Sequence, residues 1–115
     1  MGARIPVTEA ESALLDVLWT SGPLPPARLL AEVRARRAWG DATIKTLLGR
    51  LMRKKAVRSE RDEGRLVYRP LVGRQAYLAA EVNDLVQRLF DGDPDALRAF
   101  LDQSVAGEVR PRPRS

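Results

Sequence analysis

The spacing of apolar residues along the chain predicts two helices in its first third. Thr8-Glu9-Ala10-Glu11 has the form of a capping box, in which a hydroxyl and a carboxylate each bond a backbone amide at a helix start. The helix it opens is predicted to run to about Trp19, and a second helix from Pro26 to about Arg37. The residues expected to be buried on these helices are Ala10, Leu14, Val17, Leu18, Leu30 and Val33, with Leu15 and Trp19 on an adjoining stripe.

A third helix, predicted over residues 41–55 with Gly40 or Asp41 at its start, has the most regular pattern. Its apolar face follows the i, i+3, i+4, i+7, i+8 spacing and consists of Ile44, Leu47, Leu48, Leu51 and Met52. The opposite face is small, hydrogen-bonding or cationic and consists of Ala42, Lys45, Thr46, Gly49, Arg50 and Arg53. Such a face suits a DNA major groove about 12 Å wide. A solvated surface helix has the same pattern, so the neighbouring elements must decide between these interpretations.

The segment after the third helix predicts a β-hairpin. Residues 56–60 and 65–70 alternate in polarity around the turn Arg61-Asp62-Glu63-Gly64. Because a short turn with Gly40 joins the second and third helices, the arrangement is a helix-turn-helix, and a hairpin directly after it is a wing. The hairpin carries Arg58, Arg61, Arg65 and Arg69. Arginines also protect exposed strand edges from pairing, and the sequence leaves both roles open.

From Gly73 onward the charge becomes acidic and helical spacing returns. Two helices are predicted, the second starting at Asp93 and Pro94. Their apolar positions are Leu78, Val82, Leu85, Val86, Leu89, Phe90, Leu97, Phe100 and Leu101. We expect this stripe to meet its counterpart in a second copy of the chain; the alternative is that both helices fold back on the first domain.

These elements predict a mainly α fold with a small β-hairpin wing: a winged helix-turn-helix domain over residues 7–71 and C-terminal dimerisation helices over residues 73–103. Residues 104–115, with two Pro and three Arg, are expected to form a disordered basic tail.

Charge and composition limit the classes of function that the chain can have. The net charge is +5, and residues 28–69 hold 13 Lys and Arg against 5 Asp and Glu, which indicates an anionic partner for the middle of the chain. The chain has no Cys and no His, so it lacks disulfides, thiolate metal sites and the commonest general base. With no phosphate-binding glycine pattern and no paired-carboxylate arrangement, we predict no enzyme activity, no cofactor and no metal. The lack of a membrane span or signal-peptide pattern predicts a cytoplasmic protein.

Several of these segments resemble the BlaI/MecI/CopY family of winged-helix repressors. The resemblance covers about residues 7–103 in the same order. It rests on Thr8-Glu9-Ala10-Glu11, Val17-Leu18-Trp19, residues 39–51, Lys54-Lys55-Ala56-Val57 and Tyr68-Arg69-Pro70. It implies a homodimer that binds a dyad-symmetric operator in double-stranded DNA and blocks transcription, with the third helix in the major groove and the wing on the phosphate backbone.

The resemblance also implies roles for particular residues. The base-reading residues would be Ala42, Thr43, Lys45, Thr46 and Arg50, of which Thr46 and Arg50 lead because Arg pairs bidentately with guanine and Thr offers a methyl and a hydroxyl. The phosphate contacts would be Lys45, Arg53, Lys54, Arg61 and Arg65.

Some features depart from the family pattern. Gly40-Asp41 stands where relatives often have Ser-Pro, and the lack of Cys excludes the copper-responsive mechanism. The β-lactam-responsive relatives are cleaved by a regulatory protease, and the resemblance places the scissile bond at Ala99–Phe100, with Ala99 in place of the usual Asn. Those relatives continue into a further dimer helix, so a smaller dimer interface is expected here.

Two other functions stay open at this point. In one, the winged fold binds an acidic protein in place of DNA, and a stoichiometric protein partner without any DNA footprint would indicate it. In the other, the chain binds DNA without sequence preference, and little discrimination between sites would indicate that.

Overall fold

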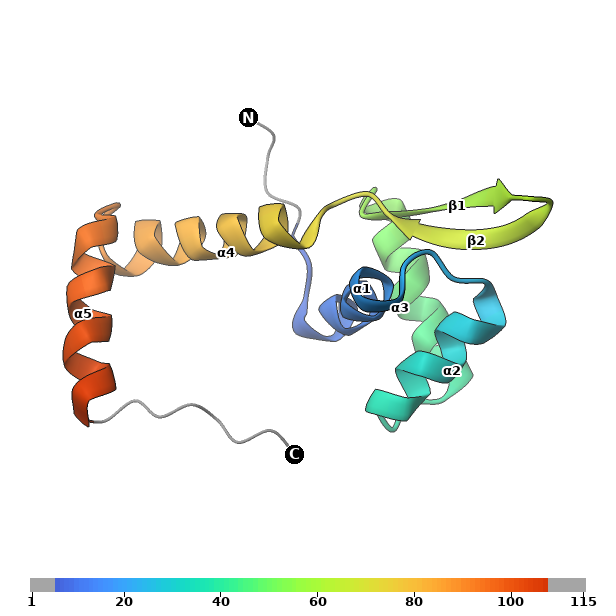
Figure 1. Cartoon of the computed structure of the whole chain (residues 1–115), viewed down its shortest axis with the longest axis horizontal. Helices are drawn as coiled ribbons and strands as arrows, with labels where there is room; N and C mark the ends of the chain where they lie inside the picture. Colours follow the sequence, from blue (N-terminus) through green and yellow to red (C-terminus); the bar gives the residue numbers. More distant parts are fainter. Residues whose placement is uncertain (1–5, 108–115) are drawn as a thin grey trace. The chain divides into compact units, whose positions relative to one another are not determined.

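The computed structural model describes residues 6–107 and, among them, the side chains of residues 6–104. Over this range the chain forms α1 (Glu9–Ser21), α2 (Pro26–Arg36), α3 (Asp41–Arg53), β1 (Val57–Asp62), β2 (Arg65–Pro70), α4 (Arg74–Leu89) and α5 (Pro94–Gly107) (Figure 1). The predicted mainly α fold with a hairpin wing is confirmed.

The chain divides into two compact units, Met1–Tyr77 and Leu78–Ser115. The division lies one turn inside α4, slightly beyond the predicted boundary at residues 71–73. The first turn of α4 belongs to the first unit because the Tyr77 ring packs on Trp19, with centroids 5.5 Å apart. Trp19 also donates its indole N–H to the carbonyl of Val72 at 2.9 Å.

Helix α1 is the centre of the first unit, because it packs against α2, α3 and β2. The predicted capping box is present: Thr8 Oγ1 accepts from the amide of Glu11 at 3.1 Å, and Glu11 Oε1 accepts from the amide of Thr8 at 3.0 Å. With neighbours on several sides, α1 is buried around much of its circumference. Leu14, Leu15, Val17 and Leu18 are fully enclosed, Ala13 is buried, and Ala10 is only half-buried.

Helices α2 and α3 begin where the sequence predicts. Pro26 occupies the first turn of α2, and Gly40 precedes α3 as its N-cap. On α2 the buried pair is Leu29 and Val33, whereas the prediction was Leu30 and Val33. Leu29 and Val33 are four residues apart and so share the face of α2 that packs on α1 and α3, while Leu30 is half-buried. The predicted core face of α3 is confirmed at Ile44, Leu47, Leu48 and Leu51, with Met52 half-buried.

The end of α3 turns the chain sharply into the hairpin. Lys55 has a left-handed backbone with φ 65°, and the amide of Ala56 returns to the carbonyl of Leu51 at 2.9 Å. This is the Schellman pattern, which usually has Gly at the left-handed position. Lys at that position costs about 1 kcal/mol or more. Ala56 and Val57, which follow, are completely buried.

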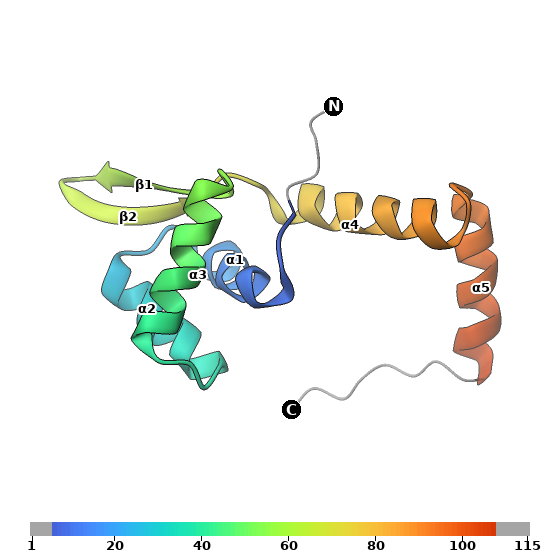
Figure 2. The same cartoon turned by 180° about the vertical axis from the view of Figure 1, so that it is seen from behind.

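Strands β1 and β2 form an antiparallel hairpin at the C-terminal end of α3 (Figure 2). Asp62 pairs with Arg65, and Glu63 and Gly64 both have positive φ (53° and 80°), as in a two-residue type I′ turn. The turn is therefore tighter than the predicted four-residue turn, and Arg61 and Asp62 belong to β1. Reciprocal hydrogen bonds between Leu24 and Tyr68, at 3.2 and 2.8 Å, attach the hairpin to the segment before α2.

The second unit consists of most of α4 together with α5. The predicted start of α5 is confirmed, since Asp93 Oδ1 accepts from the amide of Asp95 at 3.0 Å and Pro94 occupies the first turn. Phe90 and Phe100 pack with ring centroids 5.9 Å apart. Helix α5 continues to Gly107, so the predicted tail is wrong for residues 104–107; the rest of that prediction, residues 108–115, lies outside the described part of the chain.

Much of the predicted apolar stripe is uncovered within one chain. Val86 is buried, and Leu85, Phe90 and Leu97 are half-buried. The exposed fractions of the others are 37% for Leu78, 49% for Val82, 62% for Leu89, 49% for Phe100 and 43% for Leu101. The expectation that α5 buries Phe100 and Leu101 is thus wrong for the single chain, because two helices lack a further layer to cover this face. Among residues 6–107, no helix has both the length and the apolar character needed to cross a membrane.

Candidate nucleic-acid interface

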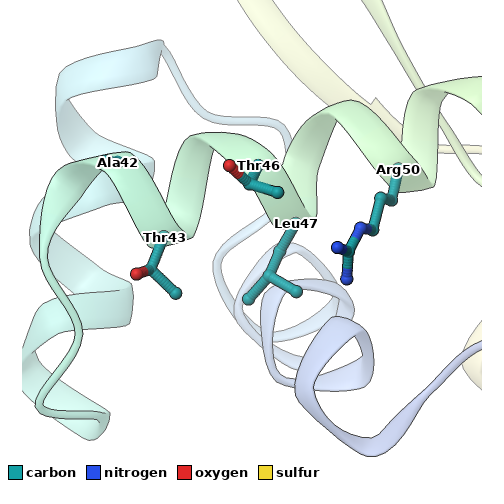
Figure 3. Close-up of a pocket in the computed structure, with 5 residues that line it drawn as sticks. All are labelled: Ala42, Thr43, Thr46, Leu47 and Arg50. Carbon is teal, nitrogen blue, oxygen red and sulfur yellow. The ribbon is translucent and has the colours of Figure 1, made fainter.

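The outward face of α3 contains a shallow hollow of about 290 Å³ (Figure 3). It is lined by Ala42, Thr43, Thr46, Leu47 and Arg50. Four of these five are residues predicted to read bases. Leu47, which the sequence assigns to the core, also lines the hollow although only 6% of it is exposed. Helical geometry, with 3.6 residues per turn, places Ala42 and Thr46 at the centre of the outward face and Thr43 and Arg50 on one flank.

Lys45 lies on the other flank of α3, apart from the rest of the predicted base-reading set. It lines a second, mainly apolar cavity of about 220 Å³ between α2, α3 and Tyr68 of β2. Its side chain is exposed and forms no hydrogen bond or ion pair with another described residue. The structure therefore brings Thr46 and Arg50 together and leaves Lys45 beside the base of the wing.

Gly49 has no internal reason to be a glycine. A Cβ added there would have Arg53 Nη1, at 3.9 Å, as its nearest neighbour, which is ordinary contact. Glycine inside a helix costs about 1 kcal/mol relative to Ala. Because nothing among the described residues compensates for this cost, Gly49 stays a candidate for close approach of an outside partner to the α3 backbone.

Many cations in the basic segment are paired with carboxylates of the same chain. Six of the 13 Lys and Arg of residues 28–69 form ion pairs with described carboxylates. The pairs are Arg28–Glu32, Arg34–Asp41, Arg37–Glu9, Lys54–Glu11, Arg58–Glu60 and Arg69–Glu60. Six others have no ion pair with any residue the structure describes, and all are exposed: Lys45, Arg50, Arg53, Lys55, Arg61 and Arg65. The remaining one, Arg36, lies near Glu32 and helps to lower the pKa of that carboxyl, after the larger effects of Ser21 and Arg28.

Lys54, which is predicted to contact phosphate, forms an ion pair within the protein. Its ammonium lies 2.5 Å from Glu11 Oε1 and donates to the carbonyl of Pro6 at 2.7 Å. Burial, the largest influence, raises the pKa of Glu11, but the hydrogen bonds from Lys54 and Thr8 together outweigh it and hold the pKa below its ordinary value. The sequence identified Glu11 as a capping residue and missed that its buried charge would need a cation.

The wing carries its charges on two distinct faces. Because side chains alternate along a strand, the observed register puts Arg61 on the face of Ser59 and Tyr68, and Arg65 on the opposite face. Glu60 lies on the face of Arg65 and accepts from Arg58 at 2.9 Å and from Arg69. The hydrogen bond from Arg69, followed by that from Arg58, holds the pKa of Glu60 below its ordinary value against the opposing effect of burial.

The two predicted wing contacts are consequently unequal. Arg61 donates to the carbonyl of Gly64 at 3.1 Å and keeps its full charge at the tip. It shares its face with Tyr68, which lines the cavity beside α3. Arg65 is the cross-strand partner of Asp62 and lies on the face of the strand that carries Arg58, Glu60 and Arg69.

The pattern that defines the penicillinase repressor family matches residues 7–109. The chain belongs to this family. Two curated relatives match most of the chain. The penicillinase repressor of Bacillus licheniformis is 24% identical over 108 residues, covering 91% of this chain and 84% of the relative. An uncharacterized 16.5 kDa protein of Latilactobacillus sakei is 26% identical over 104 residues, covering 90% and 71%.

Solved structures agree with the winged-helix fold. The DNA-binding domain of the repressor BlaI matches with a TM-score of 0.57 and 25% identity, covering 67% of this chain and 94% of that one. The monomeric form of Bacillus licheniformis BlaI in complex with the blaP half-operator matches with a TM-score of 0.60 at the same identity and coverage. A MarR family protein from Bacillus stearothermophilus, 21% identical with a TM-score of 0.51, shares the fold over 88% of this chain and 76% of its own. The resemblance to winged-helix repressors of the BlaI type is thereby confirmed.

Proposed function

We propose that this penicillinase repressor family member is a transcriptional repressor that binds a specific operator in double-stranded DNA through α3 and the wing. The observation that carries the proposal is the outward face of α3, where Thr46 and Arg50 line one hollow beside unpaired cations. The relative solved with its half-operator supports the same use of the fold.

In this proposal the α3 face reads the sequence. Arg50 pairs with the acceptor edge of a guanine, while Thr46 and Thr43 offer a hydroxyl or a methyl to neighbouring bases. Ala42 is small enough for the helix to sit deep in the groove. Lys45 lies on the opposite flank of α3. We therefore expect it to contact a phosphate or a base at the edge of the site, not a base at its centre.

Phosphate contacts come from cations that have no ion pair with a described residue. Arg53 extends the outward face of α3 by one turn, and Lys55 follows its end. Arg61 is the leading wing contact, and Arg65 is a second one from the opposite face of the tip. These contacts supply affinity and orientation but no sequence choice.

We further propose that the repressor acts as a homodimer on a dyad-symmetric operator. The support is the apolar surface that a single chain leaves open on α4 and α5, where Leu89, Phe100 and Val82 are each about half exposed or more. An isologous interface between two copies would cover it and would place two α3 helices on one DNA duplex.

Release of the operator would follow an inducing signal or proteolysis by a regulatory protease. Ala99 and Phe100 are both exposed on α5. Cleavage between them would separate Phe100 from the main part of the chain and so remove its packing on Phe90. The dimer surface would be weakened, and with it the affinity for a two-half-site operator.

A footprint on the DNA upstream of the protein's own gene tests the central claim. We expect two protected half-sites about one helical turn apart. The logarithm of the binding constant should fall linearly with the logarithm of the salt concentration. Protection that is equal on operator and scrambled DNA would reject sequence-specific repression. A stoichiometric acidic protein partner without any footprint would reject DNA as the ligand.

A further inference from the structure

Among the described residues, Glu11 is the charged side chain that is almost completely buried, with 1% of its surface exposed. A single oxygen of its carboxylate accepts from the amide of Thr8 at 3.0 Å and from Lys54 Nζ at 2.5 Å. Lys54 also donates to the carbonyl of Pro6 at 2.7 Å. The start of α1, the segment before it and the end of α3 therefore meet at one point.

The capping of α1 does not by itself require a charge at this position. A capping box works with either Glu or Gln at its last residue. A buried carboxylate is costly, and replacing a buried ion pair with apolar residues of similar size is often neutral or stabilising. Apart from its favourable position at the start of the α1 dipole, the negative charge of Glu11 serves to hold Lys54.

Lys54 is in turn the last residue before the chain leaves α3. It is the C-cap of α3, where a cation is favoured by the helix dipole, as Glu11 is in the first turn of α1. The next residue, Lys55, has the strained left-handed backbone that turns the chain toward β1. Strained residues persist where the surrounding structure constrains them from several sides. The Lys54–Glu11 link and the buried Ala56 and Val57 supply such constraints on either side of Lys55.

We propose that Glu11 and Lys54 form a positioning pair that fixes the direction of the wing relative to α3, so that both elements reach the same DNA duplex together. Neither residue touches DNA in this proposal. Glu11 acts through Lys54, and Lys54 acts through the turn into β1. The proposal rests on the DNA binding proposed above. It assigns a role in that binding to two residues 43 positions apart that do not themselves contact DNA.

The main test uses a double substitution that removes both charges and leaves the net charge unchanged. In Glu11→Gln/Lys54→Met, Gln preserves the capping box and Met preserves the unbranched side chain. If the pair positions the wing, the wing cations should lose their contacts with DNA in this double variant. The slope of log K against log salt then falls by about one to two for each protomer. Operator affinity at low salt falls by about tenfold or more, since even one or two lost contacts have that effect.

The chain offers a matched control in Glu9→Gln/Arg37→Met. This pair also joins the first turn of α1 to a cation, with 2.5 Å between the charged atoms, but the Glu9 side chain is 78% exposed. The control variant should keep the wild-type salt slope. If Glu11→Gln/Lys54→Met keeps both the wild-type slope and the wild-type affinity, the positioning role is refuted and the pair only stabilises the fold.

A second measurement applies where the double variant does not fold, and it needs no DNA. In Glu11→Gln alone, amide hydrogen exchange at Ala56, which donates to Leu51, should accelerate by about tenfold or more relative to Leu15 in the centre of α1. Equal acceleration at both amides would overturn the proposal. If wild-type protein binds no operator, the proposed function fails, while this exchange experiment still decides whether the pair holds the turn.

Discussion

The two arginines of β1, Arg58 and Arg61, provide a direct test of how the wing uses its charge. The hairpin register places them on opposite faces, and among the described residues only Arg58 of the two has a carboxylate partner, Glu60, at 2.9 Å. Arg61 bonds a neutral carbonyl and keeps its charge available. We expect Arg61→Ala to reduce the salt dependence of operator binding, whereas Arg58→Ala should leave it nearly unchanged.

The magnitude follows from counterion release. Each phosphate neutralised on duplex DNA contributes about 0.9 to the slope of log K against log salt. Loss of Arg61 from both protomers of a dimer should therefore lower the slope by about two. Over a fourfold increase in salt, this corresponds to a difference of about tenfold in affinity between wild type and variant.

The assay is fluorescence anisotropy of labelled operator DNA, titrated with each variant at several salt concentrations from about 50 to about 200 mM. Arg61→Ala should weaken operator and scrambled DNA by similar factors, because a phosphate contact carries no sequence information. Equal slope changes for Arg58→Ala and Arg61→Ala would refute the conclusion that the ion pair with Glu60 keeps Arg58 from contacting phosphate. A change confined to operator DNA would show that Arg61 reads bases.

Further predictions concern the groove, the buried pair, the strained turn and the dimer. Arg50→Ala should cost about 1 to 3 kcal/mol on operator DNA and much less on scrambled DNA, measured in the same assay, and equal losses would count against base reading. Lys54→Met should destabilise the winged unit by about 2 to 3 kcal/mol at about pH 7 in urea unfolding, because Glu11 loses a charge-assisted hydrogen bond while buried. The pKa of Glu11 is held below its ordinary value of 4.5, so the stabilisation from the pair is present above that pH and is lost as pH falls through the lower folded pKa. The difference between wild type and Lys54→Met should accordingly shrink as the pH is lowered through the acid range below that ordinary value, and a constant difference would exclude charge as its cause. Lys55→Gly should raise stability by up to about 1 kcal/mol, since φ 65° is unstrained for glycine, and a loss of stability would contradict the strain argument. Leu89→Glu changes the most exposed of the large apolar side chains described. It should shift sedimentation toward single chains and weaken binding to DNA with two half-sites far more than binding to DNA with one. An unchanged sedimentation coefficient would show that Leu89 is not part of the dimer interface.

The sequence by itself determined the elements and most of their inner faces, because the signals involved are local. A period of 3.6 residues identified the core side of α3, and a capping box, a proline in the first turn and a glycine before α3 marked helix starts within one residue. The two-residue turn of the wing was placed less well, since alternation alone does not show where pairing ends. The outward positions of α3 followed from the same period, and Thr46 and Arg50 indeed lie together.

Tertiary structure decided which charges are available to a partner. The segment of residues 28–69 has a large excess of cations in sequence, yet six of its cations are paired, one of them with a carboxylate 43 residues away. Register decided that Arg61 and Arg65 lie on opposite faces of the wing, because a shift of one residue would exchange the two faces of a strand. The long-range pairs and the strand register depend on which distant segments meet, and no local pattern of residue types contains that information.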